Sequence, residues 1–214
     1  TEGVHIHIID AELMGKGEKE KKDLYIEGVQ NNGIINHYEY IINSEGTIEI
    51  RHVLKPEGKM PLWFPRIGLT LTVSDALDQV KWYGRGPQEN YPDRKTGYPT
   101  GIYASTVQAM YEPYLMPQDY GLRTDVRWLQ LTTDKGIGLQ FKMNEWFNFN
   151  IYPYSTDNLT KAMYTYQLQK QKGMTLNLDY ATTGVGCTAR GVFGAYKAMP
   201  QEYRRTISIR PMMK

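Results

Sequence analysis

One stretch organises this chain of 214 residues, Lys81-Trp82-Tyr83-Gly84-Arg85-Gly86-Pro87-Gln88-Glu89-Asn90-Tyr91-Pro92-Asp93-Arg94. Two glycines and two prolines within it exclude a regular helix or an interior strand along its whole length. Gly84 and Gly86 can adopt backbone angles closed to other residues, whereas Pro87 and Pro92 fix φ. The stretch is therefore predicted to be a strand that runs into a polar, tightly specified loop.

This loop has two interpretations. In one it faces a ligand, and Trp82, Tyr83 and Tyr91 offer stacking surfaces. In the other it is structural, and its charged side chains satisfy one another, Arg85 and Arg94 with Glu89 and Asp93. Because structural ion pairs outnumber catalytic ones, the residue types favour the structural interpretation.

The run WYGRGPQENYPDR at 82–94 resembles the WxGxGPxENYPDR signature of the C-terminal domain of glycoside hydrolase family 2 β-galactosidases. Further blocks follow in the family's order: YEPYLMPQ at 111–118 resembles YxPYxxPQ, GLR at 121–123 resembles GxR, and 126–128 reads VRW. With PRIG at 65–68, the resemblance extends over at least residues 65–211. The signature positions are Trp82, Gly86, Pro87, Glu89, Asn90, Tyr91, Asp93 and Arg94.

The resemblance implies an all-β fold, a large antiparallel super-sandwich that is galactose-mutarotase-like and has few short helices. In this family the sandwich packs beside a (β/α)₈ barrel and lends a loop to the rim of the active site. Both catalytic glutamates and the Mg and Na sites of the intact enzyme belong to that barrel. The resemblance therefore implies no catalytic residue, metal ligand or cofactor in this chain. It implies as partners the other domains of the same polypeptide, especially the barrel, together with a galactoside substrate, and it leaves a homo-oligomer open.

One loop departs from the family pattern. The lac-type enzyme reads GxGGxDSW there, and its tryptophan forms part of the subsite for the aglycone, whereas this chain reads GVGCTARG at 184–191. Arg190 and Gly191 fall about where that tryptophan would be, and the loop is closer to the family's GxGxxxCG variant, with Arg190 at the cysteine. The resemblance thus implies a β-galactosidase-like hydrolase with an unassigned acceptor. Its candidate rim residues are Arg190, Gly191 and Cys187.

Glycoside hydrolysis needs two carboxyl groups, about 5–5.5 Å apart for retention or about 6.5–9.5 Å apart for inversion. The acids near the signature blocks all stand beside an arginine, a proline or both: Glu89, Asp93, Glu112, Asp119 and Asp125. A carboxylate paired with arginine has a lowered pKa, the wrong direction for a general acid. We therefore expect structural carboxylates here and no hydrolysis by this chain alone.

Two other functions remain as alternatives. A carbohydrate-binding module would stack sugars on exposed rings, although aromatic side chains of a β-sandwich are usually core; its candidates are Trp82, Tyr91, Tyr111 and Trp128. A mutarotase-like epimerase would need a histidine acid and a carboxylate base that meet on the sugar. The four histidines all lie in the first quarter, away from the aromatic-rich loops: His5, His7, His37 and His52.

Composition sets wider bounds. With 41% hydrophobic residues, 22% charged residues and a formal net charge of +2, the chain has no field that argues for nucleic acid or an anionic membrane. Cys187 is the only cysteine, which excludes an internal disulfide framework and a multi-cysteine metal site. The length suits one β domain over 1–214, and a start at Thr1 suggests a piece of a longer chain, whose compartment stays unassigned.

Alternating apolar residues predict the strands. Residues 98–120 are expected to be ordered coil, and the one predicted helix runs from a Ser155 cap to about Ala162. His5 and His7 share one strand face, where solvated side chains are favoured over metal ligands. The first quarter is predicted to be an antiparallel meander. The strands are expected at 5–9, 24–29, 34–43, 47–54, 66–73, 80–83, 126–131, 138–143, 147–152, 175–180 and 204–210.

Overall fold

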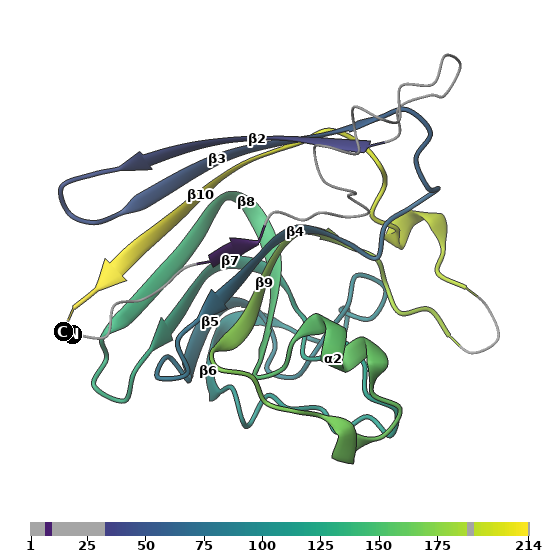
Figure 1. Cartoon of the computed structure of the whole chain (residues 1–214). Coiled ribbons are helices and arrows are strands. Elements are labelled where there is room, and N and C mark those ends of the chain that lie inside the picture. Colours follow the sequence, from purple (N-terminus) through teal and green to yellow (C-terminus); the bar gives the residue numbers. More distant parts are fainter. Residues whose placement is uncertain (1–6, 10–32, 188–190, 214) are drawn as a thin grey trace.

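Figure 1 shows the computed structural model, which describes residues 7–9, 33–187 and 191–213. The described residues form antiparallel strands with one short α-helix and two 3-10 turns, so the predicted all-β antiparallel class is confirmed. No helix among them is long and apolar enough to cross a membrane. The elements are β1 (His7–Ile9), β2 (Gly33–Ile42), β3 (Ile48–Glu57), β4 (Arg66–Val73), β5 (Gln79–Arg85), β6 (Thr100–Thr106), β7 (Arg123–Thr132), β8 (Gly138–Tyr152), α2 (Thr156–Lys161), η1 (Thr165–Gln167), β9 (Met174–Thr182), η2 (Gly194–Tyr196) and β10 (Tyr203–Met212).

The sheet divides at the long strand β8. One edge of β8 pairs with β7, which continues through β5 to β6. The other edge is shared, because its first half pairs with β10 and its second half with β9. Two leaves result, β10-β3-β2 and β9-β4-β1, and the first lies over the second in Figure 1. The chain is therefore a sandwich made by one forked sheet.

Both leaves send apolar side chains into one core. Along β4 every second residue is buried, as alternation predicts for a half-buried strand. Strand β9 is buried on both faces: Leu176 and Leu178 enter the main core, whereas Asn177 and Asp179 point to the opposite face. A second cluster, built on Tyr120, Tyr152 and Leu159, packs beside that polar face. The coil before β7 therefore covers the sheet.

The structure tests three local predictions. Ser155 caps α2 as expected, since its side chain accepts a hydrogen bond from the Asn158 N–H at 3.0 Å. The prediction of coil throughout 98–120 is wrong, because Thr100–Thr106 forms β6. This strand pairs only with β5 and leaves Ile102 61% exposed, so its hydrophobic alternation is weak. The two strands expected at 138–143 and 147–152 are one continuous strand, β8.

Of the meander predicted in the first quarter, the described residues contain one hairpin, β2 with β3, and this hairpin forms as expected. In its turn the Asn43 side chain accepts from the N–H groups of Glu45 and Thr47, both at 3.0 Å. The other neighbour of β3, however, is β10, and β1 pairs with β4. These pairings depend on how the two leaves pack, which sequence order does not reveal. The expected strand at 24–29 and His5 lie outside the described residues.

Candidate functional site

The signature loop begins inside the core. Trp82 is fully buried, its Nε1 donates to the carbonyl of Arg85 at 3.0 Å, and its ring meets Phe149 edge-on at 5.9 Å. A Cβ added to Gly86 would lie 2.8 Å from the ring of Tyr103, so a larger residue does not fit there. The peptide bond between Gly86 and Pro87 is cis. Trp82 and Gly86 are thus packed among aromatic rings, whereas Tyr83 of the same stretch is 37% exposed.

Glu89 is the acceptor at the centre of the loop. Its buried carboxylate receives hydrogen bonds from Arg94 Nη2 at 2.7 Å, the Gly121 N–H at 2.9 Å and the Tyr91 hydroxyl at 3.3 Å. The Tyr114 hydroxyl donates a further one. Both carboxylate oxygens are thus occupied, and Glu89 joins the signature loop to the coil that precedes β7.

Asn90 makes a second connection to the same coil. Its Oδ1 accepts from the N–H of Thr124 at 3.1 Å and from the Thr124 hydroxyl, while its backbone N–H donates to the Leu122 carbonyl at 2.8 Å. Beside it, the guanidinium of Arg94 lies over the ring of Tyr91, 5.2 Å from the centroid. The signature residues therefore hold residues 121–124 in place through buried polar contacts.

The charged residues of the loop were expected to pair with one another, and this is right for Arg94 but wrong for Arg85. Arg94 pairs with Glu89, but Arg85 donates to Asp125 Oδ2 at 2.5 Å, and Lys95 Nζ approaches the same carboxylate at 2.8 Å. Burial alone would raise the pKa of Asp125, yet the hydrogen bonds from Arg85 and Lys95 hold that pKa below its ordinary value. Arg85 therefore pairs with Asp125, and Asp93 accepts its hydrogen bonds from other groups.

Asp93 anchors the loop at 184–191, which we call the rim loop. Its Oδ1 accepts from the Val185 N–H at 3.1 Å and its Oδ2 from the Gly186 N–H at 2.7 Å. A Cβ on Gly184 would stand 2.3 Å from Asp93 Cγ, and Gly186 has a φ of +67°, where side chains are strained. The glycines at 184 and 186 are therefore required by the anchor.

The base of the rim loop is closed by further hydrogen bonds. The Thr183 hydroxyl donates to the Phe64 carbonyl and accepts from the Ala198 N–H at 2.9 Å, and the Gly184 N–H donates to the Tyr196 carbonyl at 2.9 Å. Beyond this base, Cys187 and Gly191 are exposed. Arg190 lies outside the described residues.

Exposed apolar side chains occur on the rim loop and on the two segments hydrogen-bonded to its base. We call this set the loop-side apolar patch. Exposed apolar side chains on neighbouring segments are a feature of many interaction sites. Its members are Leu62, Trp63, Val185, Phe193, Tyr196 and Met199.

The acids near the signature blocks differ in how the fold shifts their pKa values. The expected lowering of the pKa holds at Asp125 but is wrong at Glu112, where burial raises the pKa and the charge of Glu89 adds to the effect. Across the described ranges, no three His, Cys, Asp or Glu side chains come close enough together to hold a metal ion.

The alternative functions fare differently. Trp82 and Tyr91 are buried and cannot stack on a sugar, and Tyr111 packs edge-on against Tyr120 at 5.3 Å. His52, one of the four histidines of the first quarter, is buried beside Tyr180 of β9 and lines a pocket with Asp179. No sequence pattern predicted that meeting, since the two residues belong to different leaves.

The fold and the anchored loop define an antiparallel β-sandwich domain whose signature motif is a structural brace. A family model described as the β-galactosidase small chain matches residues 5–209. The chain belongs to this family of β-galactosidase small-chain domains, and the resemblance drawn from the signature is confirmed.

Similar proteins carry the matching name. A protein named β-galactosidase from Priestia megaterium is 38% identical over 147 residues, which is 69% of this chain and 14% of that protein. One from Vibrio cholerae is 39% identical over 122 residues, 57% of this chain and 11% of the relative. One from Pseudoalteromonas haloplanktis is 34% identical over 148 residues, again 69% and 14%. The chain thus spans a small part of the length of these relatives.

Proposed function

We propose that this chain is the C-terminal part of a β-galactosidase that hydrolyses terminal β-D-galactosides, and that its rim loop borders the active site. The relatives named β-galactosidase support the enzyme class. The observation that carries the rim assignment is the Asp93 anchor, which binds two backbone N–H groups at the start of a glycine-rich loop.

This mode of anchoring suits a loop that contacts a ligand. Asp93 binds the main-chain N–H groups of Val185 and Gly186, so this anchor fixes the start of the loop without using the side chains of those two residues. A loop fixed in advance loses little conformational entropy when it meets a substrate, which favours precise contacts. The loop-side apolar patch supports a neighbouring domain against the same end of the sandwich.

The proposal divides the work between domains. The catalytic carboxylates come from a barrel elsewhere in the polypeptide, because Glu89 and Asp93 are occupied by hydrogen bonds here. The rim loop acts on the leaving-group side, where Arg190 can donate hydrogen bonds to the aglycone or stack on it. It changes which galactosides are cleaved and leaves the bond-breaking step to the barrel.

A pair of glycine variants in the full-length polypeptide tests this function. Gly184→Ala forces a Cβ against Asp93, whereas Gly97→Ala meets nothing within 4 Å and serves as the matched control. kcat/KM is measured for β-galactosides that differ only in the aglycone. We expect Gly184→Ala to change the ratios among substrates and Gly97→Ala to leave them as in the wild type. Equal losses on every substrate would reject the rim assignment, and a wild-type polypeptide that binds galactosides without cleaving them would favour a binding module.

A further inference from the structure

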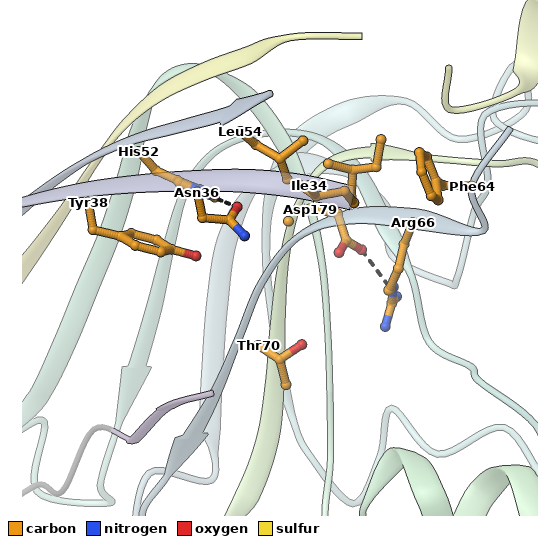
Figure 2. Close-up of a pocket in the computed structure, with 11 residues that line it drawn as sticks. Ile34, Asn36, Tyr38, His52, Leu54, Phe64, Arg66, Thr70 and Asp179 are labelled. Atoms are coloured by element: carbon orange, nitrogen blue, oxygen red, sulfur yellow. Dashed lines mark hydrogen bonds and ion pairs between the residues drawn. The ribbon is translucent and has the colours of Figure 1, made fainter. Parts of the chain in front are cut away.

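A pocket of about 100 Å³ opens between the two leaves of the sandwich. Figure 2 shows β2 and β3 on one side of it and β4 and β9 on the other. A cavity needs about 10–15 Å³ on this measure to hold one water, so there is room for several waters or one small molecule. No described residue of the signature loop or of the rim loop lines this pocket, and the proposed function does not use it.

Asp179 offers the pocket a carboxylate oxygen. The side chain is buried, and its Oδ2 receives Arg66 Nη2 at 3.1 Å and the Thr182 hydroxyl at 3.2 Å. Within the described part of the chain, no group donates to Oδ1. Opposite it stands Gly68, where an added Cβ would come within 2.9 Å of that oxygen. The missing side chain thus leaves Oδ1 open to a donor from a ligand.

Asn36 offers a donor from the other leaf. Its Oδ1 lies 3.0 Å from His52 Nε2, and His52 Nδ1 lies 2.7 Å from the Tyr180 hydroxyl. Because a carbonyl oxygen only accepts, Nε2 carries the proton in the contact with Asn36. Among the described residues the amide nitrogen of Asn36 has no acceptor, and in Figure 2 the carboxamide points toward the side of the pocket that carries Asp179. Its N–H groups are therefore available to a ligand.

The charges and rings of the pocket favour a neutral ligand. Arg66 is already engaged by Asp119 at 3.3 Å and by Asp179 at 3.1 Å, so its positive charge is balanced by two carboxylates. An anion would meet those carboxylates without a cation left to bind it. The ring of Tyr38 stacks on His52, with centroids 4.2 Å apart, and Phe64 adds an apolar wall. Such walls suit the C–H groups of a ring that also carries hydroxyls.

We propose that this pocket binds a neutral polyhydroxylated ligand the size of a single sugar ring. One hydroxyl donates to Asp179 Oδ1 and another accepts from Asn36 Nδ2. A hydroxyl both donates and accepts, so one class of group satisfies both sides of the pocket. This site is separate from the proposed active-site rim and does not depend on the enzyme class.

The test is a nuclear magnetic resonance titration of the 214-residue chain with D-galactose, D-glucose and inorganic phosphate. At least one sugar should bind saturably, with a dissociation constant of about 1–10 mM, and shift the side-chain amide signals of Asn36. Asn36→Ala should weaken this binding at least about tenfold, because it removes the donor. Tyr166→Ala is the control, since Tyr164 and Tyr166 form an exposed stacked pair that could itself hold a sugar.

The outcomes separate cleanly. Absence of saturable sugar binding, loss of binding in Tyr166→Ala, or phosphate binding as tightly as the sugars would each overturn the proposal. If Asn36→Ala does not fold, Asn36→Asp decides, since it has nearly the same shape and replaces the donating amide by an oxygen. Sugar affinity retained in a folded Asn36→Asp protein would equally overturn the assignment, and its loss would support it.

Discussion

Gly184 lies so close to Asp93 that a Cβ at residue 184 would stand 2.3 Å from the carboxylate carbon. The signature loop and the rim loop are therefore one structural unit, although 92 or more positions separate their hydrogen-bonded residues. Asp93 supplies both acceptors, and the glycine supplies the room. The signature motif, whose residue types favoured a structural role over a ligand-facing one, here supports a second loop.

Asp93→Asn should release the rim loop. Asparagine keeps one acceptor but turns an N–H group toward a backbone N–H; because these hydrogen bonds are exposed or only part-buried, we expect a loss below the roughly 1–3 kcal/mol of a buried unpaired donor. Hydrogen exchange of the Val185 and Gly186 amides should speed up, while exchange at the core amide of Leu71 should speed up only as far as global stability is lost. Unchanged protection at 185 and 186 would show that the anchor does not hold the loop.

Glu89→Gln should destabilise the whole domain. Glutamine has one acceptor where the carboxylate takes four donors, so we expect a loss of about 1–3 kcal/mol, at the level of a charged hydrogen-bond network and reduced because Arg94 is 48% exposed. Denaturant unfolding gives the value. Glu49→Gln is the matched control, because Glu49 pairs with Arg51 on the surface, and it should change stability much less. Equal effects of the two substitutions would contradict a central role for Glu89.

Asp179 should make stability fall as the pH rises from about 4 to about 7. Burial raises its pKa from 3.8 to about 7 in the folded chain, although Arg66 opposes the rise. The folded state therefore holds a proton that the unfolded state has lost within this window, and the stability so gained disappears as the pH passes the folded pKa. Asp125 has a lowered pKa, so its contribution changes only below 3.8.

Asp179→Asn isolates this effect. Urea unfolding of the variant and the wild type at intervals across that window should give a shallower decline in the variant. Parallel curves would mean that Asp179 keeps an ordinary pKa in the folded chain.

The 214-residue chain alone should not hydrolyse a chromogenic β-galactoside. Three of its acids near the signature, Glu89, Asp93 and Asp125, are committed to arginine, lysine or backbone N–H groups. A turnover assay on the purified chain measures this. Activity that disappears on mutation of Glu89 or Asp93 would show that these carboxylates are catalytic and that their structural role is misassigned.

Sequence alone predicted the parts of the fold that alternation governs. In β4, Ile67, Leu69 and Leu71 alternate with small or polar residues, and all three are buried. β6 was not predicted, because it is an edge strand whose residues are all exposed or half-buried. Apolar and polar residues therefore do not alternate along it, and Ile102 is exposed. The family signature predicted the type of domain, but it did not predict which distant residues of the signature loop and the rest of the chain contact one another.

In the candidate site, too, contacts between residues close in sequence could be predicted, whereas contacts between distant segments could not. The pairing of Arg94 with Glu89 follows from a spacing of five residues, whereas Arg85 with Asp125 and Asp93 with Gly186 join distant segments. The glycines of the rim loop were a usable signal for an unusual backbone, but not for the residue that requires it. His52 and Asp179 meet only because two leaves of the sandwich fold together.

The most direct test of the central claim is Arg190→Ala in the full-length polypeptide, assayed on galactosides that differ only in the aglycone. Arg204→Ala is the control, because Arg204 lies on β10, is exposed and pairs with Glu202 just before that strand. If the rim loop borders the leaving-group side of the active site, Arg190→Ala changes relative kcat/KM among these substrates by about 1–3 kcal/mol, as expected for a lost charged hydrogen bond, and Arg204→Ala does not. Equal effects of Arg190→Ala on every galactoside, or no effect, would contradict the account.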